Sequence, residues 1–258
     1  MCAAPATARQ SALPRVALAG NPNTGKTSLF NRLTGANARV GNYPGVTVER
    51  EIGRWTIGVG PVEVMDVPGA YSLAARSAEE QVAMRAIFGL DGDVRPSALI
   101  LVVDATQLVR NLYFALQIIE ANVPTVIALN LMDIARAQGD APDPQRVADA
   151  LGVPVVGVSA NTGEGLDALA AAVSKVLANP DTGRARPAWR YPHAAEKDIA
   201  RIAPLVASSD PAEARALALW ALLSVEPGDE LIDVPANVRA AVAEVRAAED
   251  TAGRGSNA

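Results

Sequence analysis

"GNPNTGKT", residues 20–27, lies between the apolar run RVALAG (15–20) and the amphipathic stretch KTSLFNRLTG (26–35). It fits the pattern G-x-x-x-x-G-K-[ST], whose glycines let the backbone curl so that several N–H groups point at phosphate oxygens. Lys26 reaches the β- and γ-phosphates in this pattern, and Thr27 supplies a hydroxyl for Mg²⁺. The alternative is a glycine-rich turn of structural purpose only, but a position between a strand and a helix is what phosphate binding requires. The stretch therefore predicts a phosphate-binding loop.

The alternation of strand and helix continues along the chain. Ser77 with Glu80 forms a capping box that opens one helix, and Asp143 opens another that ends at Gly152. Strands are expected at VEREIGRWTIGV (48–59), PVEVMDV (61–67), SALILVVD (97–104), PTVIALN (124–130) and VPVVGVS (153–159). Strands that are mostly apolar on both faces and alternate with helices indicate an α/β fold with a mainly parallel, doubly wound sheet.

The sequence pattern changes after about Asn179, where a stretch rich in Pro, Gly and Arg precedes residues with helical spacing only. Asp210 starts one helix there, and Pro235 precedes another. Trp220 is expected in the core of this region and His193 on its surface. We expect a flexible tail at 1–13, a nucleotide-binding domain at 14–179, a small helical domain or subdomain at 180–250 and a second flexible tail at 251–258.

Composition narrows the class of protein. The net charge of −5 and the pI near 5.0 give no long-range attraction to nucleic acid or anionic lipid. Cys2 is the single cysteine, so a disulfide within the chain and a cysteine metal site are excluded, and a reducing cytoplasm fits best. The apolar runs are far shorter than the roughly 20 residues that a membrane-spanning helix needs, and no signal peptide precedes them. We therefore expect a soluble cytoplasmic chain.

Three further motifs follow predicted strands. In DVPG, Asp66 can hold a magnesium-bound water and the Gly69 N–H can contact a γ-phosphate. In NLMD, the carboxylate of Asp133 can accept hydrogen bonds from the ring N–H and the exocyclic amine of guanine, and adenine has no such amine. In SAN, the backbone N–H of Ala160 can contact the guanine oxygen, although this motif is weak alone. In this order behind a phosphate-binding loop, the motifs predict a GTP-binding domain.

A mobile segment is expected between the first helix and the first hairpin strand, in ANARVGNYPGVTVER. Thr47 is the only threonine there, so we expect its hydroxyl to reach Mg²⁺ and its backbone to sense the γ-phosphate. Gly41 and Gly45 would let the segment move, although it could also be an ordinary surface loop. The two switch segments are expected at Ala36 to Glu51 and at Asp66 to Arg76.

These stretches resemble the N-terminal G domain of the bacterial ferrous iron transport protein B (FeoB) family. The resemblance rests on GNPNTGKTSLFNRLTG, RVGNYPGVTVER, DVPGAYSL, VVDATQLVRNLY, ALNLMD and LGVPVVGVSA, which cover most of residues 15–178. ARALALWALLSVEPGD is more loosely similar to the family's helical domain, described as a guanine-nucleotide dissociation inhibitor. Era-like GTPases that act on ribosomes or RNA are the nearest alternative, but they usually carry N-K-x-D where this chain has Leu131. A nucleotide-dependent binding switch with negligible turnover is the other alternative.

The resemblance implies a P-loop GTPase fold followed by a small all-helical domain. It also implies a slow, regulatory GTPase of a ferrous iron transporter, placed at the cytoplasmic face of the bacterial inner membrane. The implied partner is the membrane transporter region, which is missing from this chain. No nucleic acid partner is implied, and a homo-oligomer is compatible with the family.

GTP or GDP and Mg²⁺ are the expected ligands, with Thr27, Thr47 and Asp66 at the magnesium and Asp66 acting through a water. In potassium-activated members of the family, an asparagine of the phosphate-binding loop helps to coordinate K⁺. The matching residue is Asn23, and the alternative is that it only holds the loop together by hydrogen bonds. A cation beside the β- and γ-phosphates would stabilise the charge that develops during transfer.

Ala70 occupies the position where many GTPases have a glutamine that orients the attacking water. In the family this position is typically not glutamine, and backbone groups of the first switch place the water, so turnover is expected to be slow. Catalytic roles are expected for Lys26, Asn23, Thr47 and Gly69. Contacts to the nucleotide are expected from Gly20, Asn21, Asn23, Thr24, Gly25, Lys26, Thr27, Ser28, Gly45, Val46, Thr47, Asp66, Gly69, Asn130, Met132, Asp133, Ser159, Ala160 and Asn161.

Overall fold

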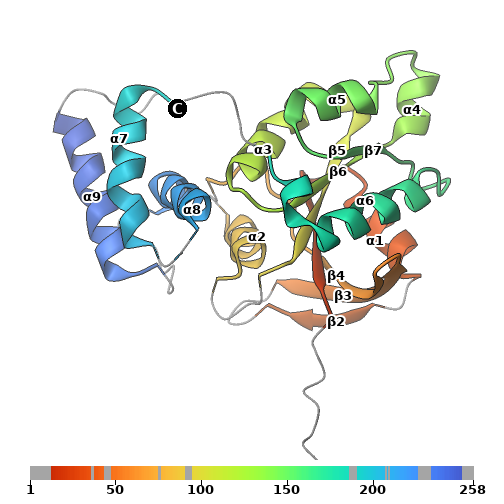
Figure 1. Ribbon diagram of the computed structural model, residues 1–258, viewed down its shortest axis with the longest axis horizontal. Coiled ribbons are helices and arrows are strands. Elements are labelled where there is room, and N and C mark those ends of the chain that lie inside the picture. The colour runs from red at the N-terminus through yellow and green to blue at the C-terminus, as the bar shows by residue number, and fades with distance from the viewer. Residues whose placement is uncertain are drawn as a thin grey trace, which may run out of the picture.

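The computed structural model describes residues 13–35, 38–43, 48–74, 77–90, 95–185, 191–206, 208, 210–225 and 234–251. Within these residues the chain forms one seven-stranded sheet in the order β2-β3-β4-β1-β5-β6-β7 (Figure 1). The strands are β1 (Arg15–Gly20), β2 (Arg39–Asn42), β3 (Glu49–Ile57), β4 (Gly60–Asp66), β5 (Ala98–Asp104), β6 (Thr125–Asn130) and β7 (Val155–Gly157). Only the β2–β3 and β3–β4 pairs are antiparallel, which confirms the mainly parallel sheet.

Helices cover both faces of the sheet, as the apolar strands require. Helices α1 and α6 pack on one face against Val16, Ile100 and Val126, while α2 and α3 pack on the other against Ala17, Leu101 and neighbouring side chains. The helices are α1 (Lys26–Thr34), α2 (Ala78–Phe88), α3 (Leu108–Glu120), α4 (Met132–Ala137), α5 (Pro144–Leu151), α6 (Leu166–Ala178), α7 (His193–Ile202), α8 (Pro211–Ser224) and α9 (Ala236–Thr251), with 3₁₀ turns at Ala105–Gln107, Pro180–Gly183 and Ala203–Leu205. None of the described helices is both long and apolar enough to cross a membrane.

Local sequence signals place several helix ends correctly. The Ser77 hydroxyl accepts from the Glu80 N–H, and the Glu80 carboxylate accepts in return from the Ser77 N–H, so the predicted capping box is present at the start of α2. Asp143 caps α5, and Gly152 ends it with φ near 72°. These caps fix the residues at which α2 begins and at which α5 begins and ends.

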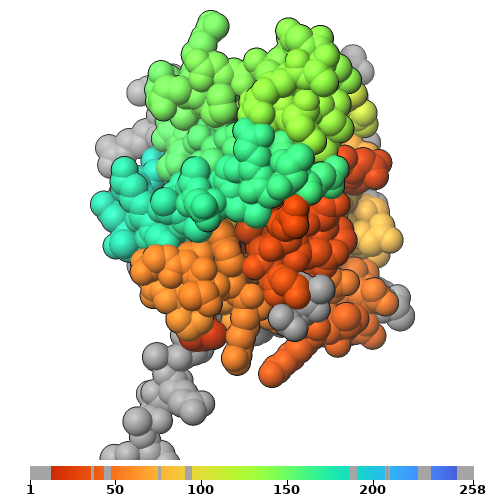
Figure 2. Space-filling model, turned by 90° about the vertical axis from the view of Figure 1, so that its right-hand side faces the viewer, coloured from red at the N-terminus to blue at the C-terminus, as the bar shows by residue number. Residues whose placement is uncertain are grey.

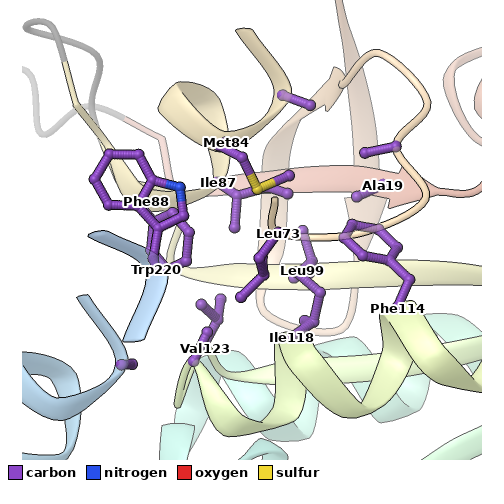
Figure 3. Close-up of a cluster of buried hydrophobic side chains, with 14 of the residues drawn as sticks. Ala19, Leu73, Met84, Ile87, Phe88, Leu99, Phe114, Ile118, Val123 and Trp220 are labelled. Atoms are coloured by element: carbon purple, nitrogen blue, oxygen red, sulfur yellow. The ribbon is translucent and has the colours of Figure 1, made fainter. Parts of the chain in front are cut away.

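The helical region, which we define as α7, α8 and α9, lies beside α2 (Figure 1). Trp220 of α8 is buried, as expected, and its ring lies 6.0 Å from that of Phe88 at the end of α2. Figure 3 shows Trp220 and Phe88 in the same apolar cluster as Leu73, which belongs to the loop after β4. His193 begins α7 and is exposed, as expected. The apolar core therefore runs without a break from the sheet into the helical region.

Two strands differ from the sequence-based expectation. β2 is not predicted by the pattern, because it has only four residues, all of them exposed, and no alternation of apolar side chains. β7 covers Val155–Gly157 rather than all of VPVVGVS, and its side chains are only partly buried at the edge of the sheet.

Figure 2 shows the face of the molecule that α6 covers. On this face α6 lies between the β3–β4 hairpin on one side and α4 and α5 on the other, and α1 lies beside it.

Candidate nucleotide-binding site

The phosphate-binding loop joins β1 to α1 at the carboxyl edge of the parallel strands. Three of its residues have positive φ: Gly20 at 156°, Asn23 at 66° and Gly25 at 80°. A Cβ at Gly20 would lie 2.4 Å from the Val102 carbonyl oxygen, so this position requires glycine for close approach to β5. The predicted strand, turn and helix are thus all present around GNPNTGKT.

Side chains of the loop divide into those that build it and those that face outward. Asn21 and Thr24 are buried, and the Thr24 hydroxyl donates to the Asn21 carbonyl at 2.9 Å. Asn23, Thr27 and Ser28 are exposed. The Thr24 side chain therefore supports the loop by binding the Asn21 backbone, while the exposed side chains of Asn23, Thr27 and Ser28 remain available for a ligand.

Lys26 and Asp66 form an ion pair across the loop, with Lys26 Nζ 2.6 Å from Asp66 Oδ1. Both side chains are largely buried, with 12% and 15% of their surface exposed. Burial raises the pKa of Asp66 above its ordinary value, and the positive charge of Lys26 partly opposes this rise. The two groups that the sequence assigns to phosphate and magnesium thus neutralise each other in this structure.

The DVPG segment lies directly against the phosphate-binding loop. The Ala70 N–H donates to the Gly20 carbonyl at 3.3 Å, and a Cβ on Gly69 would lie 3.0 Å from the Pro22 ring. Ala70 itself is buried in the apolar core, so its methyl group does not line the adjoining hollow. This hollow, of about 440 Å³, is lined by Asn21, Pro22, Asn23, Gly25, Lys26, Thr27, Ser28, Pro68, Gly69 and Glu79.

Asn130 joins two loops of the site. Its side chain is fully buried, its Nδ2 donates to the Thr24 carbonyl at 2.9 Å, and its Oδ1 accepts from the Ala160 N–H at 3.0 Å. Gly25 leaves room for this amide, because a Cβ there would lie 2.4 Å from Asn130 Nδ2. The Ala160 N–H, which we expected to contact a guanine oxygen, is thus engaged by Asn130, and a contact to guanine would require it to be shared or released.

Asp133 and Ser159 meet at the carboxyl ends of β6 and β7. The buried Ser159 hydroxyl donates to Asp133 Oδ1 at 3.0 Å and accepts from the Asp133 N–H at 3.0 Å. Leu131 is the N-cap residue of α4 and has a φ of 64°, and the Met132 side chain is buried rather than presented at the surface. The reciprocal hydrogen bonds fix one carboxylate oxygen of Asp133, so its orientation is set before any ligand arrives.

Arg32 and Tyr43 were not singled out by the sequence analysis, yet both support the site. Arg32 Nε donates to the backbone carbonyl of Ala160 at 3.1 Å, and Arg32 Nη2 donates to the backbone carbonyl of Asn161 at 2.7 Å. The Asn161 side chain is exposed. The buried Tyr43 hydroxyl donates to the Asp66 carbonyl at 3.0 Å. Both contacts go to backbone atoms distant in sequence, so no local pattern could indicate them. Gly45, Val46 and Thr47 lie outside the described residues.

Leu73, within the predicted second switch, connects the site to the helical region. Its side chain is fully buried, and its N–H donates to Gln117 Oε1 of α3 at 2.9 Å. The Ser224 hydroxyl of α8 donates to the Leu73 carbonyl at 2.6 Å. Figure 3 shows the Leu73 side chain in the centre of the cluster that includes Met84, Ile118 and Trp220. Leu73 is therefore held between α3 and α8 of the helical region.

The sequence is similar to known proteins over the part of the chain that contains the sheet and the four loops of the site. The family described as ferrous iron transport protein B (FeoB_N) matches residues 14–173. The Fe(2+) transporter FeoB of Salmonella typhimurium LT2 is 45% identical over 168 residues, which are 64% of this chain and 21% of that protein. The Escherichia coli K12 protein of the same description is 43% identical over the same shares. The chain thus spans about a fifth of the length of these relatives.

Solved structures extend the similarity beyond the sheet. A GDP-bound mutant of S. thermophilus NFeoB is 35% identical, with a TM-score of 0.73 over 93% of this chain and 92% of that one. The cytosolic domain of L. pneumophila FeoB is 32% identical, with a TM-score of 0.76 over 91% of this chain and 89% of that one. Both alignments include the helical region as well as the sheet.

Replacing Asn130 with alanine should lower the free energy of unfolding by about 2 to 4 kcal/mol, because the Thr24 carbonyl and the Ala160 N–H would both be left buried without a partner. Urea unfolding followed by circular dichroism measures the change. Asn161→Ala is the matched control, since its exposed side chain forms no hydrogen bond within the described part of the chain and its carbonyl contact to Arg32 persists. A loss below about 1 kcal/mol for Asn130→Ala would contradict the bridging role.

Proposed function

The chain belongs to the ferrous iron transport protein B family, and we propose that it is the GTP-binding, slowly hydrolysing and regulatory domain of a ferrous iron transporter. The arrangement of the four loops carries the proposal: Asn130 joins the phosphate-binding loop to the SAN loop, and DVPG and NLMD lie at the same sheet edge. This is the edge at which doubly wound folds bind their ligands. The GDP bound to the S. thermophilus relative supports guanine nucleotide as the ligand.

We propose that Asp133 selects guanine. Its Oδ1 is held by Ser159, and a second carboxylate oxygen remains to accept from a base. A base without the exocyclic amine would leave the negative charge of the Asp133 carboxylate incompletely paired, so such a base should bind much more weakly than guanine. Asn130 supports this part of the site through its hydrogen bonds to the backbone of the two neighbouring loops rather than by contact with the base.

Asp133→Asn should weaken GTP binding at least about a hundredfold and confer binding of xanthosine triphosphate, because the new amide donates where the carboxylate accepted. The Ser159 hydroxyl can still donate to the remaining oxygen, so the fold is expected to persist. Titration with fluorescent GTP and XTP measures both affinities. Asp140→Asn, on an exposed aspartate beyond α4, is the control. Unchanged GTP affinity in Asp133→Asn would overturn the assignment of guanine.

Mg²⁺ fits the oxygen donors of this site. The exposed Thr27 hydroxyl and the Asp66 carboxylate, through a water, would hold the ion, and Thr47 is the proposed third residue. When bound, Mg²⁺ supplies positive charge to the β- and γ-phosphates. Lys26 must leave Asp66 to reach the phosphates, so we propose that nucleotide binding breaks the ion pair described above. Gly69 lies beside Pro22 of the phosphate-binding loop, and we propose that its N–H binds the γ-phosphate.

We propose slow hydrolysis with a contribution from K⁺. Ala70 is buried and has no group that could orient a water, so water positioning is assigned to the backbone of the first switch around Thr47. Asn23 is exposed at the rim of the 440 Å³ hollow, beside Lys26 and Thr27. Its amide oxygen could coordinate K⁺ there and place a positive charge near the transferred phosphate.

GTP turnover in KCl should exceed turnover in NaCl by at least about tenfold, which corresponds to about 1.4 kcal/mol in the barrier. Asn23→Gly should abolish the difference, because glycine removes the amide yet tolerates the positive φ of 66°. Asn23→Asp keeps an oxygen at this position and should retain the response. Phosphate release measured in each salt tests the proposal, and equal rates in both salts for the unaltered protein would exclude a potassium role. Undetectable single-turnover decay would exclude hydrolysis itself.

We propose that the helical region slows GDP release by holding the second switch. Ser224 and Gln117 fix both backbone polar groups of Leu73, and the side chain fills the core shared by α2, α3 and α8. A switch pinned seven residues after Asp66 has less freedom to move away from the phosphates. Iron transport itself, the cytoplasmic side of the membrane and self-association are proposed from the family alone, as properties of the longer protein.

Ser224→Ala should speed GDP dissociation about threefold to tenfold, because a buried hydrogen bond of about 0.5 to 1.5 kcal/mol to the second switch is lost. Displacement of a fluorescent GDP by excess GDP measures the rate. Ser174→Ala, which removes a comparable hydroxyl bond within α6, serves as the matched control. If Ser224→Ala lowers stability but leaves the dissociation rate unchanged, the contact is structural only.

A further inference from the structure

The β2–β3 hairpin carries opposite charges on its two faces. Side chains alternate along a strand, so Arg50, Ile52 and Arg54 of β3 share one face while Glu49 and Glu51 share the other. Cross-strand partners lie on the same face. The register pairs Arg39 of β2 with Ile52 of β3. It pairs Glu63 of β4 with Arg54 of β3 on one side and with Arg15 of β1 on the other. Four arginines thus gather on one face of a chain whose net charge is −5.

This basic face is hollowed and incompletely neutralised. A hollow of about 610 Å³ is lined by Arg15, Arg39, Arg50, Arg54, Ile52 and Glu63 among other residues. Glu63 is the single acidic residue in the lining, and its 3.4 Å contact is to Arg15. Arg39 and Arg54 are exposed, and neither forms an ion pair with any residue in the described part of the chain. An anionic group would therefore find unpaired guanidinium groups here.

The neighbouring strand edge adds a second feature. β2 is the edge strand, all four of its residues are exposed, and its outer side pairs with no strand among the described residues. By register the Arg39 side chain lies on the basic face and that of Val40, which is 65% exposed, lies on the face of Glu51, while Val40 also borders the hollow at the strand edge. An edge with such alternation is complementary to an added strand in which acidic residues alternate with apolar ones.

We propose that the β2 edge and its basic face form a docking surface for an extended, acidic segment of a partner protein. The carboxylates of that segment would pair with Arg39 and Arg54, and its apolar side chains would lie beside Val40. Arginine forks match carboxylates bidentately, which favours a peptide over a less directional counter-ion. A flat bilayer is a poorer fit, because the arginines line a hollow and the basic face carries no lysine. The proposal rests on the charges and the strand edge alone, and β2 with Arg50 lies within the segment expected to form the first switch.

A fluorescein-labelled decapeptide of alternating Asp and Val, read by anisotropy at low salt, is the probe. We expect binding to the unaltered protein, and at least about a tenfold loss of affinity in Arg39→Glu/Arg54→Glu, since close charge pairs become repulsive. Arg146→Glu/Lys197→Glu, on α5 and α7, makes the same change in net charge at exposed positions and should bind the peptide normally. Arg39→Ser/Arg54→Ser provides a milder change should the reversal disturb the hairpin.

Hydrogen exchange distinguishes strand addition from ionic attraction alone. Amide exchange at residues 39–42 should slow when the peptide is present, and an alternating Lys and Val peptide should cause neither binding nor slowing. Equal loss of binding in the two charge-reversal variants would overturn the proposal, as would unchanged exchange at β2. So would arginine-dependent sedimentation with phosphatidylglycerol vesicles in the absence of peptide binding, which would assign the surface to lipid instead.

Discussion

One buried amide holds the candidate site together. Asn130 ends β6, and its two polar groups bind backbone atoms of the phosphate-binding loop and of the loop after β7. Because Asn130 is fully buried, neither bond can be replaced by water without opening the core. Asn130 therefore links the loop assigned to phosphate directly to the loop assigned to guanine, and Arg32 of α1 adds a second link to the latter. The glycine at position 25 follows from the same constraint, since any Cβ there would collide with the amide.

The packing of the helical region also reaches Leu73, in the loop after β4. Buried side chains of α2, α3, α8 and α9 belong to one apolar cluster, so the core does not stop at the boundary that the sequence predicts near residue 180. Leu73 lies where the sheet domain and the helical region meet, and both of its backbone polar groups are satisfied by side chains. The segment after DVPG and α8 are thus joined by packed side chains and by the Ser224 hydrogen bond.

Much of this structure could be predicted from the sequence, because its strongest signals are local. The strand, loop and helix around GNPNTGKT, the capping box of α2 and the Asp143 cap all depend on residues within one or two turns of each other. β2 could not be predicted, since a four-residue exposed strand has no apolar alternation and is defined only by its partner β3. The supporting roles of Arg32, Tyr43 and Ser224 could not be predicted from the sequence for a related reason. Their partners are backbone atoms far away in sequence, and such contacts leave no pattern in the chain.

The ion pair between Lys26 and Asp66 also bears on how the protein behaves between ligands. A site built for several phosphate charges and a divalent cation would, when vacated, hold a lysine and a carboxylate in a poorly hydrated cleft, each destabilising its surroundings. Because the two side chains pair with each other, neither charge is buried alone. In the nucleotide site proposed above, an incoming phosphate would have to displace Asp66 from Lys26, and this competition would weaken binding and favour release.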